Sequence, residues 1–323
     1  GGTNVQFAHD PATGRVVVIE INPRTSRSSA LASKATGFPI AFVSSLRACG
    51  LRLDEIPYAR DGTLDKYTPS GDYVVVKFPR WGFEKFEGVE DRLGTQMRSV
   101  GEAMSIGKNY KEALHKAIRS METGRYGLGF ARDFHERGLD DLLAMLGNAT
   151  SERQFIMFDA LRKGADIGML SARTYIKRWF IEQMKELVDL EEEILAYKGK
   201  DIPEELFRRA KRDGFSDRYL SRILGKHESE LRERRLSFGI RQAWDAVPVS
   251  GVQNAAYYYS TYIGENRVGV SDRRKIMVLG GGPNRIGQGI EFDYCCVHAA
   301  FTLRDMGFES IMVNCNPETV STD

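Results

Sequence analysis

The spacing of hydrophobic and polar residues changes twice along the chain. Short apolar runs at residues 3–8 and 16–22 flank a turn-rich segment containing Asp-Pro and Thr-Gly, and this pattern predicts an antiparallel hairpin. From about residue 125 to 269, apolar residues recur every three or four positions, which predicts helices almost throughout. From about residue 270 the short apolar runs return. We therefore expect a helical region between two regions of mixed α and β structure.

Both mixed regions contain clear start and stop signals. In the first, two helices closed by glycine are predicted at residues 28–36 and 110–123. Two further strands are predicted at residues 73–78 and 100–106. In the last, a strand, a glycine-rich turn, a helix and a second strand are predicted, at residues 275–279, 280–289, 292–306 and 310–315. The strand order favours the tail of an α+β domain first and a parallel βαβ unit last.

The middle region is expected to be a small helical bundle. Its longest predicted helix, residues 173–197, has a broad apolar face made of Ile176, Phe180, Met184, Leu187, Val188 and Ile194. Three shorter helices, each followed closely by a glycine, are predicted at residues 203–213, 216–224 and 227–237. An apolar face of this kind needs a packing partner. We expect the three tryptophans to pack in cores: Trp81, Trp179 and Trp244.

Candidate chemistry gathers at the end of the second strand, which we expect to be buried. Side chains alternate across a strand, so Glu20 and Asn22 share a face, and Pro23 then ends the strand. In an antiparallel hairpin Gln6 lies roughly across from Glu20. Carboxylate and amide oxygens are the ligands that Mg²⁺ takes from proteins. The segment therefore predicts a magnesium site, with a polar strand end that simply faces water as the alternative.

Composition excludes few classes of function. The 323 residues carry 46 basic and 44 acidic side chains, a net charge of +2 that marks no binder of nucleic acid or membrane. Residues 216–235 allow a helix-turn-helix, but three glutamates alternate there with three arginines, which favours a solvated, salt-bridged face. No run reaches the length of a membrane span. The four cysteines lack zinc-ligand spacing and fit a reduced, cytoplasmic setting.

The glycine-rich turn, Gly280-Gly-Gly-Pro-Asn-Arg-Ile-Gly-Gln-Gly289, departs from both common nucleotide-binding patterns. Arg285 stands where the dinucleotide fingerprint has its third glycine, and Gln288 stands where a Walker A loop has its lysine. What remains is a strand-to-helix turn with exposed N–H groups. Such a turn can receive an anion or pack tightly against neighbouring backbone, and spacing leaves both open.

Several of these segments together resemble one family. Val16 to Ala41 resembles the end of an ATP-grasp domain, specifically that of the carbamoyl-phosphate synthetase large subunit. The likeness continues through Lys77-Phe-Pro-Arg80 and Ser99 to Gly107, and it resumes from Lys275 to the last residue. Only the middle, about residues 131–251, matches weakly.

The resemblance implies a fold class that mixes α/β and α. Residues 1–124 would be the C-terminal, α+β part of the first ATP-grasp domain, and residues 125–269 an all-helical oligomerisation domain. Residues 270–323 would begin the Rossmann-like pre-ATP-grasp domain of a second half. Because both ends of the chain fall inside dense motif, we expect a piece of a longer polypeptide that is inactive alone.

The resemblance also implies a reaction and its participants. Bicarbonate, ammonia and two MgATP would give carbamoyl phosphate through carboxyphosphate and carbamate. Gln6, Glu20 and Asn22 would hold Mg²⁺ or Mn²⁺, with Gln6 and Glu20 also serving ATP and with K⁺ as a further cation. Arg24 would act in catalysis. The carbamate passage would include Arg27, Arg285, Gly289 and Glu291. A glutamine-hydrolysing small subunit would supply the ammonia, and the helical domain would self-associate.

Two other functions stay open on the sequence. The chain could act only as a non-enzymatic association module built on its helical centre. It could also belong to another ATP-grasp ligase, such as a relative of biotin carboxylase, which shares the Glu-x-Asn strand end. The second synthetase-like start at Lys275 argues against that last reading.

Overall fold

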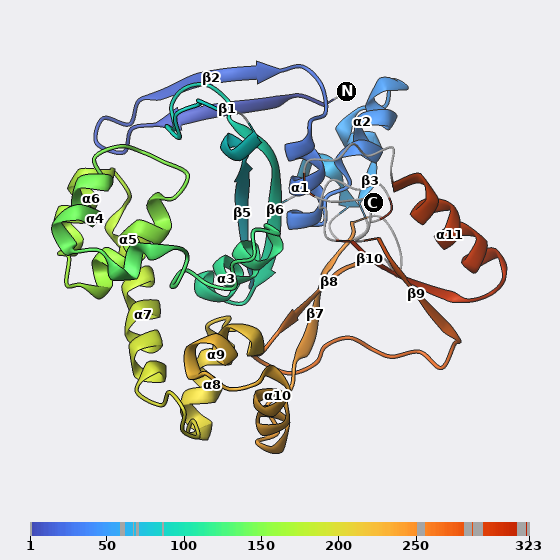
Figure 1. The fold of residues 1–323 in the computed structure, drawn as a ribbon. Helices are drawn as coiled ribbons and strands as arrows, with labels where there is room; N and C mark the ends of the chain where they lie inside the picture. The colour runs from blue at the N-terminus through green and yellow to red at the C-terminus, as the bar shows by residue number, and fades with distance from the viewer. Residues whose placement is uncertain are drawn as a thin grey trace. The chain divides into compact units, whose positions relative to one another are not determined.

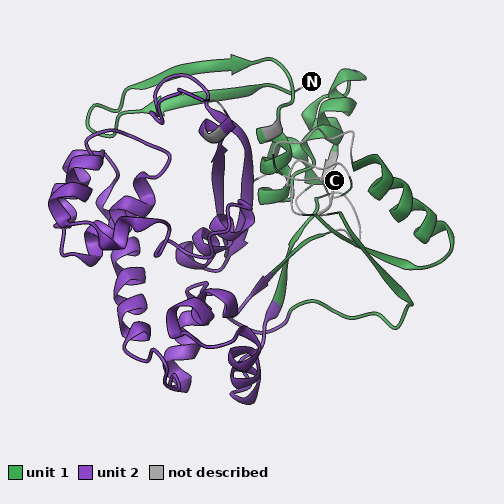
Figure 2. Cartoon of the chain, viewed as in Figure 1, with its two compact units in different colours: residues 1–72, 244–259, 267–323 green, residues 73–243, 260–266 purple. Residues whose placement is uncertain are grey.

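The computed structural model describes residues 2–58, 62–66, 68, 71–85, 87–250, 256–280, 286, 293–314 and 321. The chain divides into two compact units, coloured separately in Figure 2. Unit 1 comprises residues 1–72, 244–259 and 267–323, and unit 2 comprises residues 73–243 and 260–266. Each unit contains both helices and strands (Figure 1).

Unit 1 begins with the predicted hairpin. Strand β1 (Asn4–His9) pairs antiparallel with β2 (Val16–Asn22). The turn between them is fixed by Asp10, whose carboxylate accepts hydrogen bonds from the Ala12 N–H (3.0 Å) and the Thr13 hydroxyl (2.6 Å). The Thr13 hydrogen bond lowers the pKa of Asp10. Such a local side-chain turn joins the two strands tightly and sets their register.

Two helices and a very short strand pair follow the hairpin in unit 1: α1 (Arg27–Thr36), α2 (Ile40–Ala48), β3 (Pro57–Tyr58) and β4 (Gly62–Thr63). Helix α1 ends at Gly37 as expected, with a left-handed φ of 73°. The Gly37 N–H donates to the Ser33 carbonyl at 2.7 Å, and the Gly37 carbonyl accepts from the Ser250 N–H at 2.8 Å. A Cβ here would collide with the Pro248 carbonyl, so glycine is required twice over.

The C-terminal part of unit 1 is the predicted parallel βαβ unit. Its elements are β9 (Lys275–Leu279), α11 (Tyr294–Asp305) and β10 (Glu309–Val313). The two strands pair in parallel, from Lys275 opposite Glu309 to Leu279 opposite Val313. The order strand, helix, parallel strand confirms the expectation drawn from the hydrophobic pattern.

Unit 2 begins with a two-stranded antiparallel sheet covered by a helix. Strands β5 (Val74–Trp81) and β6 (Ser99–Gly107) pair, and α3 (Tyr110–Ser120) packs on them. Asn109 caps α3 by accepting from the Glu112 N–H at 2.7 Å. The Ser105 hydroxyl donates to the Ala113 carbonyl at 2.5 Å and ties strand to helix. Helix α3 ends three residues before its predicted end, and Glu122, two residues beyond it, has a left-handed φ of 56° that a continuing helix does not allow.

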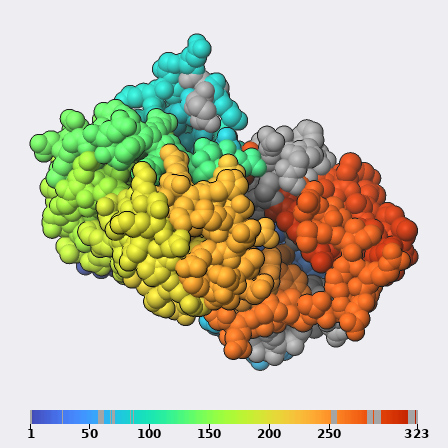
Figure 3. All heavy atoms as spheres, turned by 60° about the horizontal axis from the view of Figure 1, so that its bottom comes forward, coloured from blue at the N-terminus to red at the C-terminus, as the bar shows by residue number. Residues whose placement is uncertain are grey.

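The remaining helices of unit 2 form the expected bundle, which Figure 3 shows as a closely packed body coloured from green through yellow to amber. They are α4 (Leu139–Met145), α5 (Arg153–Arg162), α6 (Ile167–Thr174), α7 (Arg178–Leu195), α8 (Glu204–Arg212), α9 (Asp217–Leu224) and α10 (Glu228–Ser237). The prediction of a single helix at residues 173–197 was wrong. Tyr175 has a left-handed φ of 59°, which separates α6 from α7. Ile176 therefore lies outside α7 and does not belong to its apolar face.

Two other expectations also need correction. The reading of residues 125–269 as helical almost throughout fails at its end, where β7 (Ala243–Pro248) pairs with β8 (Ala256–Thr261). Two tryptophans expected in cores are exposed instead, Trp179 to 51% and Trp244 to 47%. In the part of the chain that the structure describes, no helix combines the length and apolar character needed to cross a bilayer.

Candidate functional site

The hairpin of unit 1 brings three polar side chains together at the end of β2. Gln6 and Glu20 are direct cross-strand partners. The Gln6 amide donates to Oε1 of Glu20 at 2.9 Å, and the Asn22 amide donates to the same oxygen at 2.8 Å. Glu20 and Asn22 lie two residues apart on one strand, so both point to the same face. The three predicted residues therefore form one cluster, which we call the hairpin cluster.

The surroundings of the hairpin cluster differ from the expectation of a buried strand. All of β2 is exposed except Asn22, which is half-buried, and Ile19 is 63% exposed. Among the described residues the hairpin is a sheet of two strands, and β2 is exposed on both of its faces. A register shift between Gln6 and Phe7 leaves Ile19 unpaired as a β-bulge. Bulges re-aim neighbouring side chains, and this one precedes Glu20 directly.

The donor set of the hairpin cluster fits a hard divalent cation. One carboxylate and two amides offer only oxygen ligands, the type that Mg²⁺ binds while its other positions go to water and phosphate. Across the described residues, no three His, Cys, Asp or Glu side chains gather in a metal-binding group. A cation here would therefore rely on amide oxygens beside Glu20. Turning an amide about its terminal torsion exchanges its NH₂ for its oxygen.

Of the remaining predicted site residues, only the side chain of Arg24 lies within the described part of the chain. Arg24 is exposed just after β2, and its guanidinium donates to the Thr25 carbonyl at 3.2 Å. Arg27 is the first residue of α1, but its side chain lies outside the described part of the chain. The three other residues assigned to the carbamate passage also fall outside the described residues: Arg285, Gly289 and Glu291.

The solvated face expected within residues 216–235 is confirmed on α10 except at Arg235, which joins a buried ionic network of unit 2. Asp217 accepts from the Arg235 guanidinium at 3.0 Å and pairs with the Lys211 ammonium at 2.7 Å. Arg235 is only 8% exposed, and Lys211 is buried. Burial lowers the pKa of Lys211 to about 8. Sequence spacing predicted only ion pairs within one helix, whereas Asp217 forms ion pairs with cations from two other helices, α8 and α10.

Comparison with protein families finds three models along the chain. Residues 1–56 match the carbamoyl-phosphate synthase L chain, ATP binding domain. Residues 102–239 match the carbamoyl-phosphate synthetase large chain, oligomerisation domain, and residues 272–323 match the carbamoyl phosphate synthase preATP-grasp domain. The hairpin cluster lies in the first match and the helical bundle in the second.

Curated relatives agree with the family models over the whole chain. A carbamoyl phosphate synthase large chain from Archaeoglobus fulgidus is 49% identical over 331 residues, and one from Halomonas eurihalina is 53% identical over 330. One from Vibrio parahaemolyticus is 51% identical over 329 residues. Each alignment covers 100% of this chain, but the chain spans only 31%, 31% and 30% of these relatives. The chain belongs to the carbamoyl phosphate synthase large chain family.

Proposed function

We propose that the chain forms part of an ATP-dependent ligase that makes carbamoyl phosphate from bicarbonate, ammonia and two MgATP. In this reaction the first ATP phosphorylates bicarbonate to carboxyphosphate, ammonia displaces phosphate to give carbamate, and the second ATP phosphorylates carbamate. The observation that carries the proposal is the hairpin cluster, which lies in the segment matching an ATP binding domain. Because the chain spans about a third of its relatives, it is expected to need the rest of the polypeptide for turnover.

The residues of the hairpin cluster would act by holding and positioning the nucleotide. Glu20 supplies the negative charge for a divalent cation, Mg²⁺ or Mn²⁺, and Gln6 and Asn22 supply neutral oxygens. The bound cation neutralises phosphate charge, the dominant need in phosphoryl transfer. Arg24 follows the strand end and is free to swing toward bicarbonate or the transferring phosphoryl group, because its side chain is exposed.

Other participants follow from the same proposal. Carbamate would move between two active sites along a passage that includes Arg27, Arg285, Gly289 and Glu291. Ammonia would come from a glutamine-hydrolysing small subunit, and K⁺ would be a further cation of the site. A cytoplasmic location fits an enzyme of soluble metabolites. The domain bounds 1–124, 125–269 and 270–323 belong to this proposal as well.

The proposal is tested in the full-length subunit with Glu20→Gln, which keeps the shape of the side chain and removes its charge. We expect bicarbonate-dependent ATP hydrolysis to fall at least a hundredfold, since a divalent cation in such a site stabilises the charge of the transition state by several kcal/mol. Hydrolysis at the wild-type rate would remove the metal role. Far-UV circular dichroism of the variant controls for folding.

A second function, self-association through the helical bundle, is favoured by an exposed aromatic cluster on unit 2. Trp179 at the start of α7 lies 5.3 Å from the Tyr110 ring and 5.0 Å from the Phe180 ring, centroid to centroid. Phe180 is 42% exposed and Tyr175 is 93% exposed. Aromatic side chains are enriched at protein interfaces. This surface lies in the segment that matches an oligomerisation domain, so a second copy of the chain is its proposed partner.

A further inference from the structure

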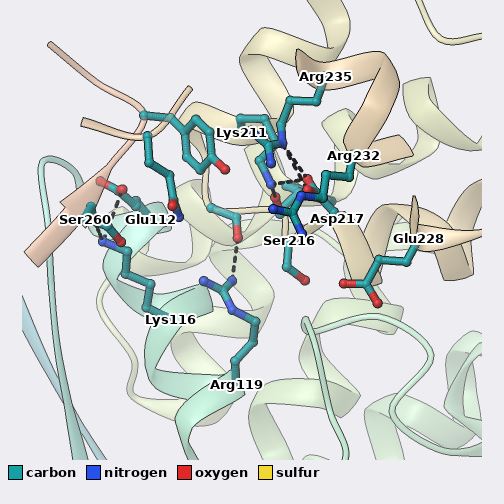
Figure 4. A pocket seen from close by; sticks show the side chains of 14 residues that line it. Glu112, Lys116, Arg119, Lys211, Ser216, Asp217, Glu228, Arg232, Arg235 and Ser260 are labelled. Carbon is teal, nitrogen blue, oxygen red and sulfur yellow. Dashed lines mark hydrogen bonds and ion pairs between the residues drawn. The ribbon is translucent and has the colours of Figure 1, made fainter. Parts of the chain in front are cut away.

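A polar cavity of about 410 Å³ lies within unit 2 (Figure 4). It is lined by residues of α3, of the end of α8 through the start of α9, and of α10, together with Gln242, Ser260 and Tyr262. It shares no residue with the hairpin cluster. Its volume falls in the range of small-molecule sites, about 300–1,000 Å³, and exceeds what a bare inorganic ion would fill.

The lining of this cavity carries an excess of positive charge. Three acidic side chains face five basic ones, which are Lys116, Arg119, Lys211, Arg232 and Arg235. Two of the acids are already engaged. Glu112 pairs with Lys116 at 3.3 Å and accepts from the Thr261 hydroxyl at 3.0 Å, while Asp217 binds both Lys211 and Arg235. The third acid, Glu228, is exposed. The group of Asp217, Lys211 and Arg235 keeps one positive charge in excess, and Arg119 and Arg232 add two positive charges against the single negative charge of Glu228.

Two arginines of the cavity keep unused donors. Arg119 donates from Nη1 to the Gly214 carbonyl at 2.6 Å, and within the described residues it forms no ion pair with a carboxylate. Arg232 forms neither a hydrogen bond nor an ion pair with any described residue. Burial lowers the pKa of Arg119 to about 10, so it remains a cation at pH 7. A guanidinium with free N–H groups is suited to bidentate contact with phosphate or carboxylate oxygens.

Neutral donors complete the lining. The Ser216 oxygen accepts from the Tyr219 N–H at 3.1 Å, which leaves the Ser216 O–H free to donate into the cavity. Burial raises the pKa of Tyr262 to about 12, so its hydroxyl stays protonated. The Tyr262 ring forms one wall, with the Lys211 ammonium 4.7 Å from its centroid. Figure 4 shows Arg119, Ser216 and Arg232 turned toward the centre of the cavity.

We propose that this cavity binds a small phosphate monoester, with its dianionic phosphoryl group held between Arg119 and Arg232. A charge of −2 balances the two cations in excess, and the volume beyond the phosphoryl group accommodates a small organic part beside Tyr262. The site is separate from the hairpin cluster, so ligand binding here is expected without Mg²⁺. A cavity that does not bind phosphate without Mg²⁺ would therefore contradict this proposal alone and leave the proposed ligase function untouched.

Isothermal titration calorimetry of the chain at fixed ionic strength, without Mg²⁺, tests the proposal with inorganic phosphate and glycerol 3-phosphate as probes. We expect saturable binding of both, with the monoester at least as tight as inorganic phosphate. Arg232→Gln should weaken each dissociation constant about tenfold, the loss of one charged hydrogen-bonded contact. Arg119→Gln should do the same. Arg212→Gln, on exposed α8 surface outside the cavity, should bind like the wild type.

The outcomes separate clearly. No saturable binding by the wild type, or equal weakening in all three variants, would show only diffuse charge attraction and overturn the proposal. Binding of inorganic phosphate without glycerol 3-phosphate would overturn the monoester assignment. Arg232 is exposed, so Arg232→Gln is expected to fold normally. Arg119→Gln loses the hydrogen bond to the Gly214 carbonyl, and if that destabilises the protein, Arg232→Gln alone decides the test.

Discussion

The hydroxyl of Tyr219 donates to the carboxylate of Glu191 in the core of the helical bundle, where both side chains are buried. The same tyrosine oxygen accepts from the Gly129 N–H at 3.0 Å, and Arg162 donates to the other carboxylate oxygen of Glu191. Burial raises the pKa of Glu191. A single hydroxyl thus satisfies two buried polar groups from segments distant in sequence.

Tyr219→Phe removes that hydroxyl and nothing else. The Gly129 N–H and one Glu191 oxygen would then be buried without this partner, and we expect the free energy of unfolding to fall by about 2–3 kcal/mol. Urea denaturation followed by circular dichroism measures the change. Tyr175→Phe, at a tyrosine of the same unit that is 93% exposed, is the matched control and should change stability by less than about 0.5 kcal/mol. Equal effects of the two variants would contradict the role of the hydroxyl.

His115 predicts a specific acid sensitivity. Burial first, and then the charge of Arg119, lowers its pKa from 6.5 to about 3, with Lys111 adding to the effect. The neutral ring uses Nδ1 for the Asp213 carbonyl at 2.9 Å, while Nε2 is buried without a partner in the described structure. The neutral His115 ring contributes to the stability of the folded state. Because the unfolded chain binds the proton more tightly, that stabilisation is complete above pH 6.5 and is lost as pH falls toward 3.

The expected loss is about 2 kcal/mol between pH 7.5 and pH 5, at 1.36 kcal/mol for each pH unit below the unfolded pKa. Urea midpoints of the wild type and His115→Gln at both pH values measure it. The variant should be less stable at pH 7.5 but lose less on acidification. His9→Gln, at an exposed histidine, should retain the wild-type dependence. An unchanged acid dependence in His115→Gln would show that another group carries it.

Self-association should depend on the aromatic cluster of unit 2. Trp179→Glu puts a charge where we expect apolar contact, so the association constant should fall at least tenfold, about 1.4 kcal/mol. Sedimentation velocity over a range of protein concentrations measures it. Trp244→Glu changes a tryptophan of similar exposure in unit 1 and should leave association intact. If both variants behave like the wild type, the contact lies elsewhere on the molecule.

The carbamate passage is tested in the full-length enzyme with Gly289→Phe. A passage for so small an anion tolerates little side-chain bulk, so ATP hydrolysis should continue while carbamoyl phosphate per ATP falls severalfold. Gly94→Phe is the control, because a Cβ at Gly94 meets no atom within 4 Å. Normal coupling in Gly289→Phe would remove that residue from the passage.

Local rules predicted the elements whose signals lie close together in sequence. The hairpin cluster followed from strand alternation and from the pairing of Gln6 with Glu20. The ends of α1 and α9 followed from Gly37 and Gly225, both left-handed. The parallel order of β9 and β10 followed from strand, helix and strand in succession. In each case a few neighbouring residues decide the structure.

Features set by tertiary packing were not predictable. Nothing local to Tyr175 marks its left-handed backbone, since tyrosine rarely adopts it. The cavity of unit 2 brings together Arg119 and Arg232 from helices more than a hundred residues apart. Hydrophobic periodicity describes each helix separately and does not indicate which helices lie next to one another. The exposure of β2 depends on which other elements cover the faces of the hairpin, and the local sequence does not contain that information.

The central claim is that Gln6, Glu20 and Asn22 hold a divalent cation for ATP. Electron paramagnetic resonance titration of Mn²⁺ in the full-length subunit with ATP measures it directly. Glu20→Gln should weaken Mn²⁺ binding at least about tenfold relative to the wild type, because the carboxylate is the only charged ligand of the cluster. Glu90→Gln, at an exposed glutamate of unit 2, should bind normally. Equal Mn²⁺ affinity in wild type and Glu20→Gln would contradict the account.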